Sequence, residues 1–440
     1  MRYETDDVIF ALATGFVKSA IAVIRVSGKN CIAGFAPYFK CRESLTSVSS
    51  NTAVYGHVKD IDDVIITVFR DGHGYTGEES FEISCHGSTV TVRNMLSLLS
   101  SIGFRQASGG EFTLRAFCNG KLDLTRAEAV NALINSEGQR ANSQALAHLE
   151  GSLFRRINEI KEILAKVMST VEVQLDYAED EISEDTEIPV TELEQAATLI
   201  EELTKTYGTG RLYCEGAKVV LAGAANAGKS SLFNLFLKED RAIVSPVEGT
   251  TRDYIEARCE ISGIPVRLYD TAGLRESDDA VEEEGVRRSR TLLEAADVII
   301  YLIDALNPVT DEAIFSDDRC IAVVNKTDAG NFDCEGALRL SVKTGEGFDR
   351  LCSFLSDRLL SGVAFSGDGD VIIQSKRQYD TLVRALENVN AVIADCEKKL
   401  PLDILAVDLQ EALEALGELT GEVTADDILD RIFSNFCVGK

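Results

Sequence analysis

The sequence predicts a multidomain protein of mixed α/β and α class. Its parts are an N-terminal α+β domain, a helical-bundle domain split along the chain, and an α/β domain inserted into the split. The length of 440 residues suggests about three domains. The apolar share of 45% and the charged share of 26% are those of a globular chain. Helical periodicity gives way to alternating strands and helices near Lys218 and returns near Ile372, which predicts the insertion.

The N-terminal stretch, residues 1–118, mixes short apolar runs with turns. The runs 21–28, 64–72 and 80–87 each end at a glycine, which predicts three strands. Residues 91–103 have helical periodicity and end at a glycine, which predicts a helix. Strands mixed with a helix indicate an α+β domain.

Two helical stretches flank the inserted domain, at residues 119–213 and 368–440. Apolar side chains recur there every three or four positions, as in amphipathic helices. An acidic run before Pro189 interrupts the first stretch. Residues 361–370 are the predicted linker from the inserted domain into the second stretch.

The inserted stretch, residues 214–367, alternates apolar runs with helical segments. Each apolar run ends in polar loop residues, as in a parallel sheet that carries its functional groups at the carboxyl ends of the strands. A helix is expected from Gly347 to about Leu360. The runs are 219–223, 265–273, 296–305, 320–328 and 338–345.

Residues 223–230, Gly-Ala-Ala-Asn-Ala-Gly-Lys-Ser, form a P-loop between a predicted strand and a predicted helix. Its glycines allow backbone N–H groups to close around phosphates, and Lys229 adds a positive charge at the β- and γ-phosphates. The Ser230 hydroxyl can ligate Mg²⁺. The residues expected at the phosphates are Asn226, Ala227, Gly228, Lys229, Ser230 and Ser231.

Three further strand-end motifs follow in the order typical of GTPases. Asp270-Thr271-Ala272-Gly273 offers a carboxylate toward Mg²⁺ and an N–H group toward the γ-phosphate. Asn325-Lys326-Thr-Asp328 offers a carboxylate that accepts two hydrogen bonds from guanine, which adenine cannot donate. Ser341-Val342-Lys would face the guanine carbonyl. The four motifs together predict a Ras-like P-loop GTPase domain that binds GTP.

Two positions distinguish this GTPase from Ras. Leu274 stands where Ras-type enzymes carry the glutamine that orients the attacking water, so another group must do so. Asn226 lies within the P-loop, and the loop 244–251 follows downstream. Asn226 and loop carbonyls could hold a monovalent cation against the phosphates.

The net charge of −28 argues against a protein that wraps nucleic acid by itself. The charge is −1 over residues 1–118, −9 over 119–213, −10 over 214–367 and −8 over 368–440. Eleven acids and no base occur between Asp176 and Glu202. A nucleic-acid substrate is compatible with this charge if a local patch or a partner supplies the phosphate contacts.

The eleven cysteines are scattered without a Cys-x-x-Cys pair, which favours a reducing cytosol over a disulfide framework. The sequence has no apolar run of about 18 residues, so a membrane span is not expected. The first residues lack a basic region before an apolar stretch, which disfavours a signal peptide. We therefore expect a cytoplasmic protein.

The whole chain resembles the MnmE (TrmE) family of tRNA modification GTPases. The order of domains matches, and the chain ends in Phe-Cys437-Val-Gly-Lys440, similar to the family's terminal Cys-[Ile/Val/Leu]-Gly-Lys. Three internal regions match as well: Tyr75-Thr-Gly-Glu with Cys85-His-Gly, Gly110–Phe117, and Asn119–Ala129.

The resemblance implies roles for individual residues. Ser230 and Thr251 would be the Mg²⁺ ligands. The K⁺ site would consist of Asn226, Ser245, Val247 and Thr250. Ser245, Thr250 and Thr251 would also contact GTP. Glu282 would be the catalytic glutamate that acts on the attacking water through a second water. The alternative is that Glu282 is an ordinary carboxylate without a catalytic role, in an acidic run on a helix. Contacts to 5-formyl- or methylene-tetrahydrofolate would come from Arg25, Glu82, Lys121 and Lys440. For Arg25 and Glu82, surface charge on strands is the alternative.

The resemblance also implies partners. Members form homodimers through the N-terminal domain and assemble with the FAD-dependent protein MnmG into a heterotetramer, with FAD on that partner. Together they install a carboxymethylaminomethyl or aminomethyl group on the wobble uridine of tRNA, using the folate's one-carbon unit.

Cys437 has three interpretations: a prenylation site, an inert thiol, or a catalytic residue near the folate. Gly439 and Lys440 disfavour prenylation, and the resemblance favours the third interpretation. The sequence departs from the family at Ala225, where proline is usual, and at residues 14–19, which replace a glycine- and arginine-rich turn.

Two other functions share some of these motifs. A ribosome-assembly GTPase has the same nucleotide motifs but usually adds a basic RNA-binding domain. A nucleotide-gated scaffold would have no chemistry of its own.

Overall fold

The structure is a computed structural model of the chain. It describes residues 6–70, 72–176, 188–238, 255–270, 291–361, 371–423, 426–434, 436 and 438–439. The chain divides into two compact units. The first unit contains residues 1–134, 148–193 and 388–440, and the second contains 135–147 and 194–387.

A seven-stranded sheet forms the N-terminal part of the first unit, with its strands in the order β3-β4-β5-β6-β2-β1-β7. All neighbours are antiparallel except β1 and β7, which are parallel. The strands are β1 (Ile9–Leu12), β2 (Ile21–Ser27), β3 (Phe39–Cys41), β4 (Thr52–Val58), β5 (Asp62–Phe69), β6 (Ser80–His86) and β7 (Arg105–Gln106).

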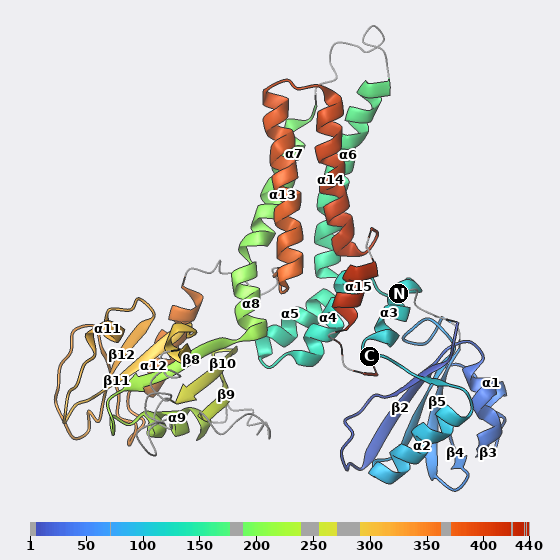
Figure 1. Cartoon of the computed structure of the whole chain (residues 1–440), viewed down its shortest axis with the longest axis horizontal. Coiled ribbons are helices and arrows are strands. Elements are labelled where there is room, and N and C mark those ends of the chain that lie inside the picture. Colours follow the sequence, from blue (N-terminus) through green and yellow to red (C-terminus); the bar gives the residue numbers. More distant parts are fainter. Residues whose placement is uncertain are drawn as a thin grey trace. The chain divides into compact units, whose positions relative to one another are not determined.

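One face of this sheet carries the core of the N-terminal part. Alternate side chains of β2, β5 and β6, such as Ile24, Ile66 and Ile83, are fully buried. Two helices, α1 (Cys31–Phe35) and α2 (Thr89–Ser101), add Phe35 and Met95 to the same core. Figure 1 shows α2 lying against this sheet. Two short 3-10 helices complete the layer, η1 (Ala36–Tyr38) and η2 (Leu45–Ser47).

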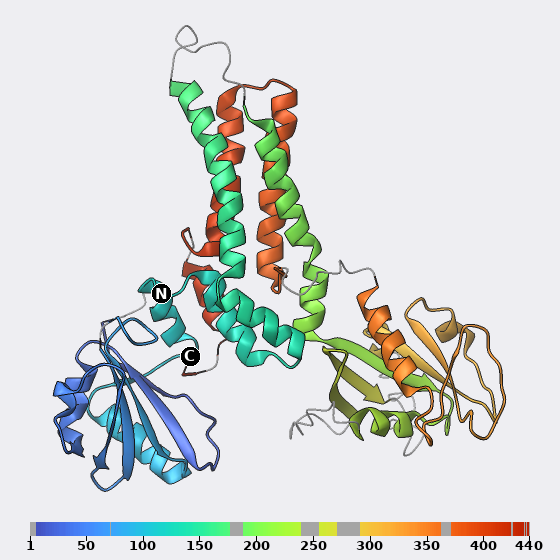
Figure 2. The same ribbon diagram turned by 180° about the vertical axis from the view of Figure 1, so that it is seen from behind.

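The rest of the first unit is helical. The helices α6 and α14 pack against each other and lie side by side in both views (Figures 1 and 2). A separate small core joins Leu114 and Leu124 to Leu429, Phe433 and Phe436 near the C-terminus. The helices are α3 (Glu111–Cys118), α4 (Leu124–Asn135), α6 (Ser152–Asp176), α14 (Leu402–Thr420) and α15 (Asp426–Phe433).

The second unit is built on a six-stranded sheet with the order β13-β12-β11-β8-β10-β9. The strands β13, β12, β11, β8 and β10 are parallel, and only the edge strand β9 is antiparallel. Buried Val, Ile and Leu side chains fill both faces of the central strands, as expected of a parallel sheet covered on both sides. The strands are β8 (Ala217–Gly223), β9 (Ile255–Ile261), β10 (Ile264–Asp270), β11 (Val298–Asp304), β12 (Cys320–Asn325) and β13 (Leu338–Arg339).

Helices α9 and α12 cover one face of this sheet. Phe236 of α9 and Phe348 of α12 meet edge to face within the core on that face. The chain reaches β8 through α8, which contacts β10. Of the remaining helices, three run along the chain from one unit into the other: α5 (Gln139–Leu149), α7 (Val190–Lys205) and α13 (Lys376–Glu397). The helices that lie wholly in the second unit are α8 (Tyr207–Glu215), α9 (Lys229–Lys238), α11 (Glu312–Phe315) and α12 (Phe348–Leu360).

The structure confirms the predicted fold class and the predicted strands of both sheets. The helix expected to end near Leu360 is α12, which ends there. The predicted linker lies almost wholly outside the described residues. The three domain boundaries at residues 118, 213 and 367 stay a prediction. Among the described residues, the helices are too short or too polar to cross a membrane.

Candidate functional site

The P-loop joins the carboxyl end of β8 to the start of α9. Gly223 and Gly228 both adopt positive φ angles, 131° and 102°. A Cβ atom on Gly223 would lie 2.3 Å from the Leu302 carbonyl oxygen, and one on Gly228 would lie 2.3 Å from Nδ2 of Asn325. Only glycine fits at these positions, so the two glycines allow the loop to turn closely over the sheet.

Lys229 points back into this loop. Its side chain is buried, and Nζ donates to the carbonyl oxygens of Gly223 and Ala224 at 2.9 Å each. Asn226, at the exposed tip of the loop, has a left-handed φ of 62°. The ammonium group is therefore held inside the turn where phosphates bind in P-loop proteins.

Ser230 and Asp270 meet across the first turn of α9. The Ser230 Oγ donates to Oδ2 of Asp270 at 2.7 Å, and Asp270 is buried at the last position of β10. The hydroxyl and the carboxylate are hard oxygen ligands of the type that Mg²⁺ prefers. The structure thus brings together two of the residues expected around the metal.

Asn325 connects the P-loop to the last predicted motif. Its Nδ2 donates to the Ala227 carbonyl at 2.8 Å, and its Oδ1 accepts from the backbone N–H of Val342 at 3.1 Å. Asn325 is 2% exposed. With both ends of its amide engaged, this side chain fixes the distance between the two loops.

Asp328 and Ser341 form a second link. The Ser341 Oγ donates to Oδ1 of Asp328 at 2.7 Å, and the Lys343 ammonium lies 3.9 Å from Oδ2. Ser341 is fully buried, whereas about a fifth of the Asp328 side chain, 22%, is exposed. The carboxylate of Asp328 is thus oriented by the loop that the sequence expects at the guanine.

Lys326 pairs with Asp304, a residue that the sequence analysis did not single out. The distance from Nζ to Oδ2 is 2.6 Å, and Oδ1 of Asp304 accepts from the backbone N–H of Leu306. Burial tends to raise the pKa of Asp304, but these hydrogen bonds outweigh it and lower the pKa. Asp304 could have been identified from the sequence by its position at the end of an apolar run, because functional groups gather at the carboxyl ends of parallel strands.

Ten predicted site residues lie outside the described residues. They are Ser245, Val247, Thr250, Thr251, Thr271, Ala272, Gly273, Glu282, Cys437 and Lys440.

The first unit contains a separate small cavity of about 140 Å³ on the sheet face opposite the main core. Arg25 on β2 and Glu82 on β6 are cross-strand neighbours in its wall. Arg25 Nε donates to Oε1 of Glu82 at 2.9 Å, and a second guanidinium nitrogen lies 2.8 Å from the same oxygen. Tyr75 lies 5.1 Å from the guanidinium in a cation–π arrangement.

Lys121 and the C-terminal tail lie close to this cavity. Nζ of Lys121 donates to the Gly72 carbonyl at 3.0 Å, in the loop that carries Tyr75. Arg25 donates to the carbonyl of Gly439 at 3.3 Å, and Val438 forms a β-bridge with Gly109. The structure therefore brings Arg25, Glu82, Lys121 and residues 438–439 to one region, and Lys440 lies outside the described residues.

Two family models match the chain. The MnmE helical domain model matches residues 124–437, and the model of the GTP-binding protein TrmE N-terminus matches residues 8–121. The curated tRNA modification GTPase MnmE of Borrelia recurrentis is 39% identical over 466 residues, with 100% of this chain and 99% of that protein covered. The chain belongs to the MnmE family. The MnmE protein of Treponema denticola is 38% identical over 468 residues, with the same coverage.

Some solved structures resemble part of this MnmE-family chain. The G domain of the T. maritima FeoB iron transporter is 24% identical, with 32% of this chain and 98% of that chain covered and a TM-score of 0.26.

The positions at which this MnmE-family chain departs from the usual motifs lie in exposed loops. Ala225 is exposed in the P-loop. The loop 14–19 lies against the Cys85-His-Gly87 motif, where Ser19 N–H donates to the Gly87 carbonyl at 3.1 Å. A Cβ atom on Gly87 would lie 2.1 Å from the Ser19 Oγ, so glycine is required there.

A buried charge cluster explains several motifs quoted for the MnmE resemblance. Arg115 is 1% exposed and contacts Asp7, Glu78 and Glu111 at 2.5, 3.4 and 3.2 Å. The Ser27 hydroxyl also donates to Glu78 at 2.7 Å, and Ser27 lines the cavity. Burial would raise the pKa of Glu111, but the hydrogen bonds from Arg105 and Ser108 outweigh it and lower the pKa. The sequence analysis did not assign this supporting role to Arg115, because its partners are far apart in the chain.

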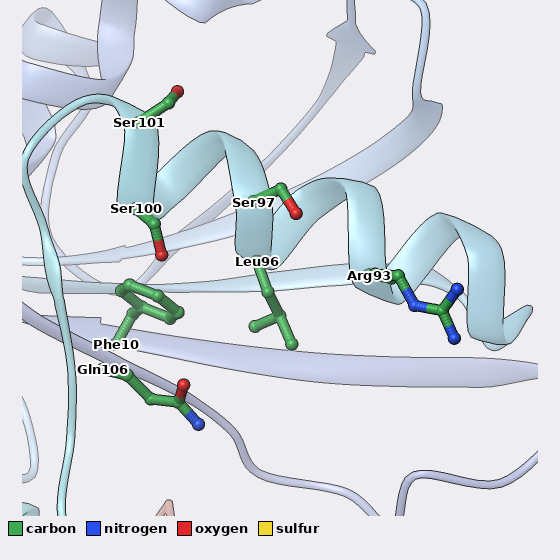
Figure 3. A pocket seen from close by; sticks show the side chains of 7 residues that line it. All are labelled: Phe10, Arg93, Leu96, Ser97, Ser100, Ser101 and Gln106. Atoms are coloured by element: carbon green, nitrogen blue, oxygen red, sulfur yellow. The ribbon is translucent and has the colours of Figure 1, made fainter.

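A wider hollow of about 510 Å³ lies between α2 and the strands β1 and β7 (Figure 3). Phe10 and Leu96 supply its apolar part. The remaining lining side chains are Arg93, Ser97, Ser100, Ser101 and Gln106. No predicted site residue lies there.

Proposed function

We propose that this chain is a K⁺-dependent GTPase that works with the FAD-dependent protein MnmG on the wobble uridine of tRNA. The two would install a carboxymethylaminomethyl or aminomethyl group with a one-carbon unit from 5-formyl- or methylene-tetrahydrofolate. Family membership makes the chain a GTP hydrolase that acts in tRNA modification. The observation that supports the site best is that β8, β10 and β12 end at Gly223, Asp270 and Asn325, along one edge of the parallel sheet.

Phosphate binding would come from the P-loop and the first turn of α9. The N–H groups of Gly228, Lys229 and Ser230 lie at the helix N-terminus, where the helix dipole favours negative charge. Nζ of Lys229 would exchange its two carbonyl partners for phosphate oxygens. Ser230, and Thr251 outside the described residues, would hold Mg²⁺, which neutralises charge on the β- and γ-phosphates when bound.

Guanine recognition would rest on Asp328. Its carboxylate, oriented by Ser341, can accept hydrogen bonds from the guanine N1–H and the 2-amino group. Asn325 would keep the phosphate and base loops at a constant distance. This geometry supports GTP over ATP, because adenine offers no donor pair at that edge.

Hydrolysis needs a group in place of the glutamine that Leu274 replaces. K⁺ held by Asn226 with Ser245, Val247 and Thr250 would supply positive charge at the phosphates. Asn226 has a left-handed backbone conformation and lies at the exposed tip of the P-loop. Glu282 would orient the attacking water through a second water.

The folate would bind at the cavity beside Arg25. A guanidinium suits a folate carboxylate, and the Glu82 carboxylate suits the N–H edge of a pterin. The volume of about 140 Å³ is below the roughly 300–1,000 Å³ of typical ligand sites. The cavity can hold only part of a folate, and Lys121, Lys440 or a second copy of the chain would complete the site. Cys437 would lie near the reacting carbon.

The assembly would be a homodimer that binds MnmG as a heterotetramer and takes tRNA as its substrate. The net charge of −28 supports a partner that supplies positive charge toward tRNA. The ten cysteines that the structure describes are all free thiols, which supports a location in the reducing cytoplasm.

Wobble-uridine analysis of tRNA tests the function as a whole. Cells that lack this chain should contain tRNA without the carboxymethylaminomethyl and aminomethyl groups, as measured by mass spectrometry of nucleosides. Re-expression of the wild-type chain should restore both groups, whereas Glu282→Ala should bind GTP without restoring them. Unchanged modification in the cells that lack the chain would refute the proposed function.

The cation site has a separate test in GTP turnover. Wild-type protein should hydrolyse GTP faster in KCl than in NaCl at equal ionic strength, and Asn226→Ala should lose this difference while still binding GDP. Asn307→Ala, a change in an exposed loop of the same unit, serves as the control. Equal rates of the wild-type protein in the two salts would show that Asn226 does not hold K⁺.

A further inference from the structure

The segment 135–147, which precedes the inserted domain by about 70 residues, belongs structurally to the unit that contains that domain. It comprises the end of α4 and most of α5. Its chain neighbours on both sides, residues up to 134 and from 148 onward, belong to the other unit. The segment is therefore attached to the nucleotide-binding unit by contacts and to the helical part by the chain itself.

Polar contacts attach the segment to β9. Glu137 forms an ion pair with Arg258 of β9. Gln139 lies two positions after Glu137, and its backbone N–H donates to Oε2 of Glu260 at 3.1 Å. Arg258 and Glu260 are alternate residues of one edge strand, so both contacts lie on the same face of β9.

Close packing attaches the segment to the turn between β9 and β10. A Cβ atom on Gly138 would lie 2.9 Å from the Pro265 side chain, and one on Gly263 would lie 3.0 Å from Cγ of Arg140. Arg140 also donates to the Tyr213 hydroxyl at 2.6 Å. Ala141 is 2% exposed within the core of the second unit. Contacts this close leave little room for the hairpin to move without the segment.

The hairpin that the segment holds leads directly to the nucleotide site. β10 runs from Ile264 at the turn to Asp270, whose carboxylate accepts from Ser230. Seven residues of strand place the turn about 20 Å from Asp270. The other strand, β9, begins at Ile255, four residues after Thr251 in the sequence. One arm of the hairpin therefore ends at a proposed site residue, Asp270, and the other begins four residues after another, Thr251.

We propose that the segment 135–147 transmits the nucleotide state from the GTPase site to the helical part of the chain. Glu137, Gln139 and Arg140 are positioning residues: they hold the hairpin turn, and a shift of β9 and β10 on GTP hydrolysis moves the segment with them. The segment passes into α4 on one side and into α6 on the other. This inference rests on the proposed function, because it requires that GTP be hydrolysed during tRNA modification.

Hydrogen exchange of the full-length protein tests the transmission directly. Peptides that cover 135–147 should exchange at rates that differ by about fivefold or more between GDP and a non-hydrolysable GTP analogue, each with Mg²⁺ and KCl. Equal exchange in the two nucleotide states, in a protein that hydrolyses GTP, would overturn the inference. A protein that hydrolyses no GTP would instead overturn the proposed function itself.

Charge reversal at the ion pair between Glu137 and Arg258 is a second test of the proposal. Arg258→Glu should reduce the exchange difference in 135–147 and lower wobble-uridine modification by about fivefold or more, with GTP hydrolysis unchanged. The double variant Glu137→Arg with Arg258→Glu should restore both, because it re-forms the ion pair with its charges exchanged. Arg319→Glu removes an ion pair with Asp317 at an arginine that is as exposed as Arg258, and it lies before β12, away from β9, so it serves as the control. Wild-type modification and wild-type exchange in Arg258→Glu would contradict the proposal.

Discussion

Asn325 decides the geometry of the nucleotide site at the scale of single residues. Its amide donates to the Ala227 carbonyl and accepts from the Val342 N–H, so one buried side chain joins the phosphate loop to the base loop. Gly228 must lack a side chain because Nδ2 of Asn325 occupies that space. The sequence predicted Asn325 as a site residue. It did not predict this bridging role, which depends on partners 98 and 17 residues away.

Asp328 carries the first prediction at this scale. Asp328→Asn replaces one acceptor oxygen by a donor, so the side chain can no longer accept from both guanine N–H groups. GTP affinity should fall by about a hundredfold or more, since each hydrogen bond to a charged group contributes about 1.5–3 kcal/mol. Xanthosine triphosphate, which carries an oxygen at position 2, should bind the variant better than GTP does.

Equilibrium titration with fluorescent nucleotides measures this exchange of specificity. Asp333→Asn, an exposed neighbour in the same unit, should leave the affinity for GTP unchanged. An Asp328→Asn variant that still prefers GTP to xanthosine triphosphate would exclude Asp328 from base recognition.

At the scale of elements, the strands with mostly apolar sequences were predictable in both sheets, whereas β4 and β9 were not. The buried runs of β8, β11 and β12 stand out because both faces of a parallel strand are covered. β4 and the edge strand β9 place polar or charged side chains at alternate positions, and β9 carries Glu256, Arg258 and Glu260 on one face. Neither strand was predicted. Without β9, the sequence offered no sign that residues 135–147 attach to the inserted domain.

The helix α5 carries a pH-dependent prediction through His148. This side chain is 2% exposed, and its Nε2 has no hydrogen-bond partner among the residues that the structure describes. Burial lowers the pKa of His148 to about 4, against the opposing charge of Glu128. The unfolded chain binds a proton near pH 6.5, whereas the folded chain does so only near pH 4. The stability that His148 provides is therefore complete above pH 6.5 and falls as the pH is lowered toward 4.

Thermal unfolding between pH 7.5 and 4.5 compares the wild-type protein with His148→Gln. The wild-type protein should lose more stability than the variant as the pH falls, approaching about 3 kcal/mol for the full pKa difference. His57→Gln, at an exposed histidine paired with Asp63, should follow the wild-type curve. If the His148→Gln curve also follows the wild type, His148 does not titrate as its burial requires.

At the scale of the whole molecule, charge separates the first third of the chain from the rest. Residues 1–118 have a net charge of −1, whereas the remaining 322 residues carry the other −27. The cavity beside Arg25, proposed for folate, lies in the near-neutral part, and the nucleotide site lies in an acidic part. The motifs in the sequence identified both regions. Arg115 with its carboxylates, and the pairing of Lys326 with Asp304, became visible only once the fold brought distant residues together.

This distribution predicts weak tRNA binding by the isolated chain. Tight binding of nucleic acid depends on Lys and Arg groups that replace counterions at the phosphates, and each such contact makes affinity fall as salt rises. A chain with 72 acids and 44 bases repels the tRNA backbone over most of its surface. Fluorescence anisotropy with labelled tRNA at 50–200 mM KCl, roughly the range in which the salt effect is strong, should show weak binding with a shallow salt slope. Addition of MnmG, the proposed partner, should increase both the affinity and the slope, because that partner would supply much of the phosphate contact. Tight binding with a steep salt slope by the isolated chain would place those contacts on this protein and remove the need for a basic partner.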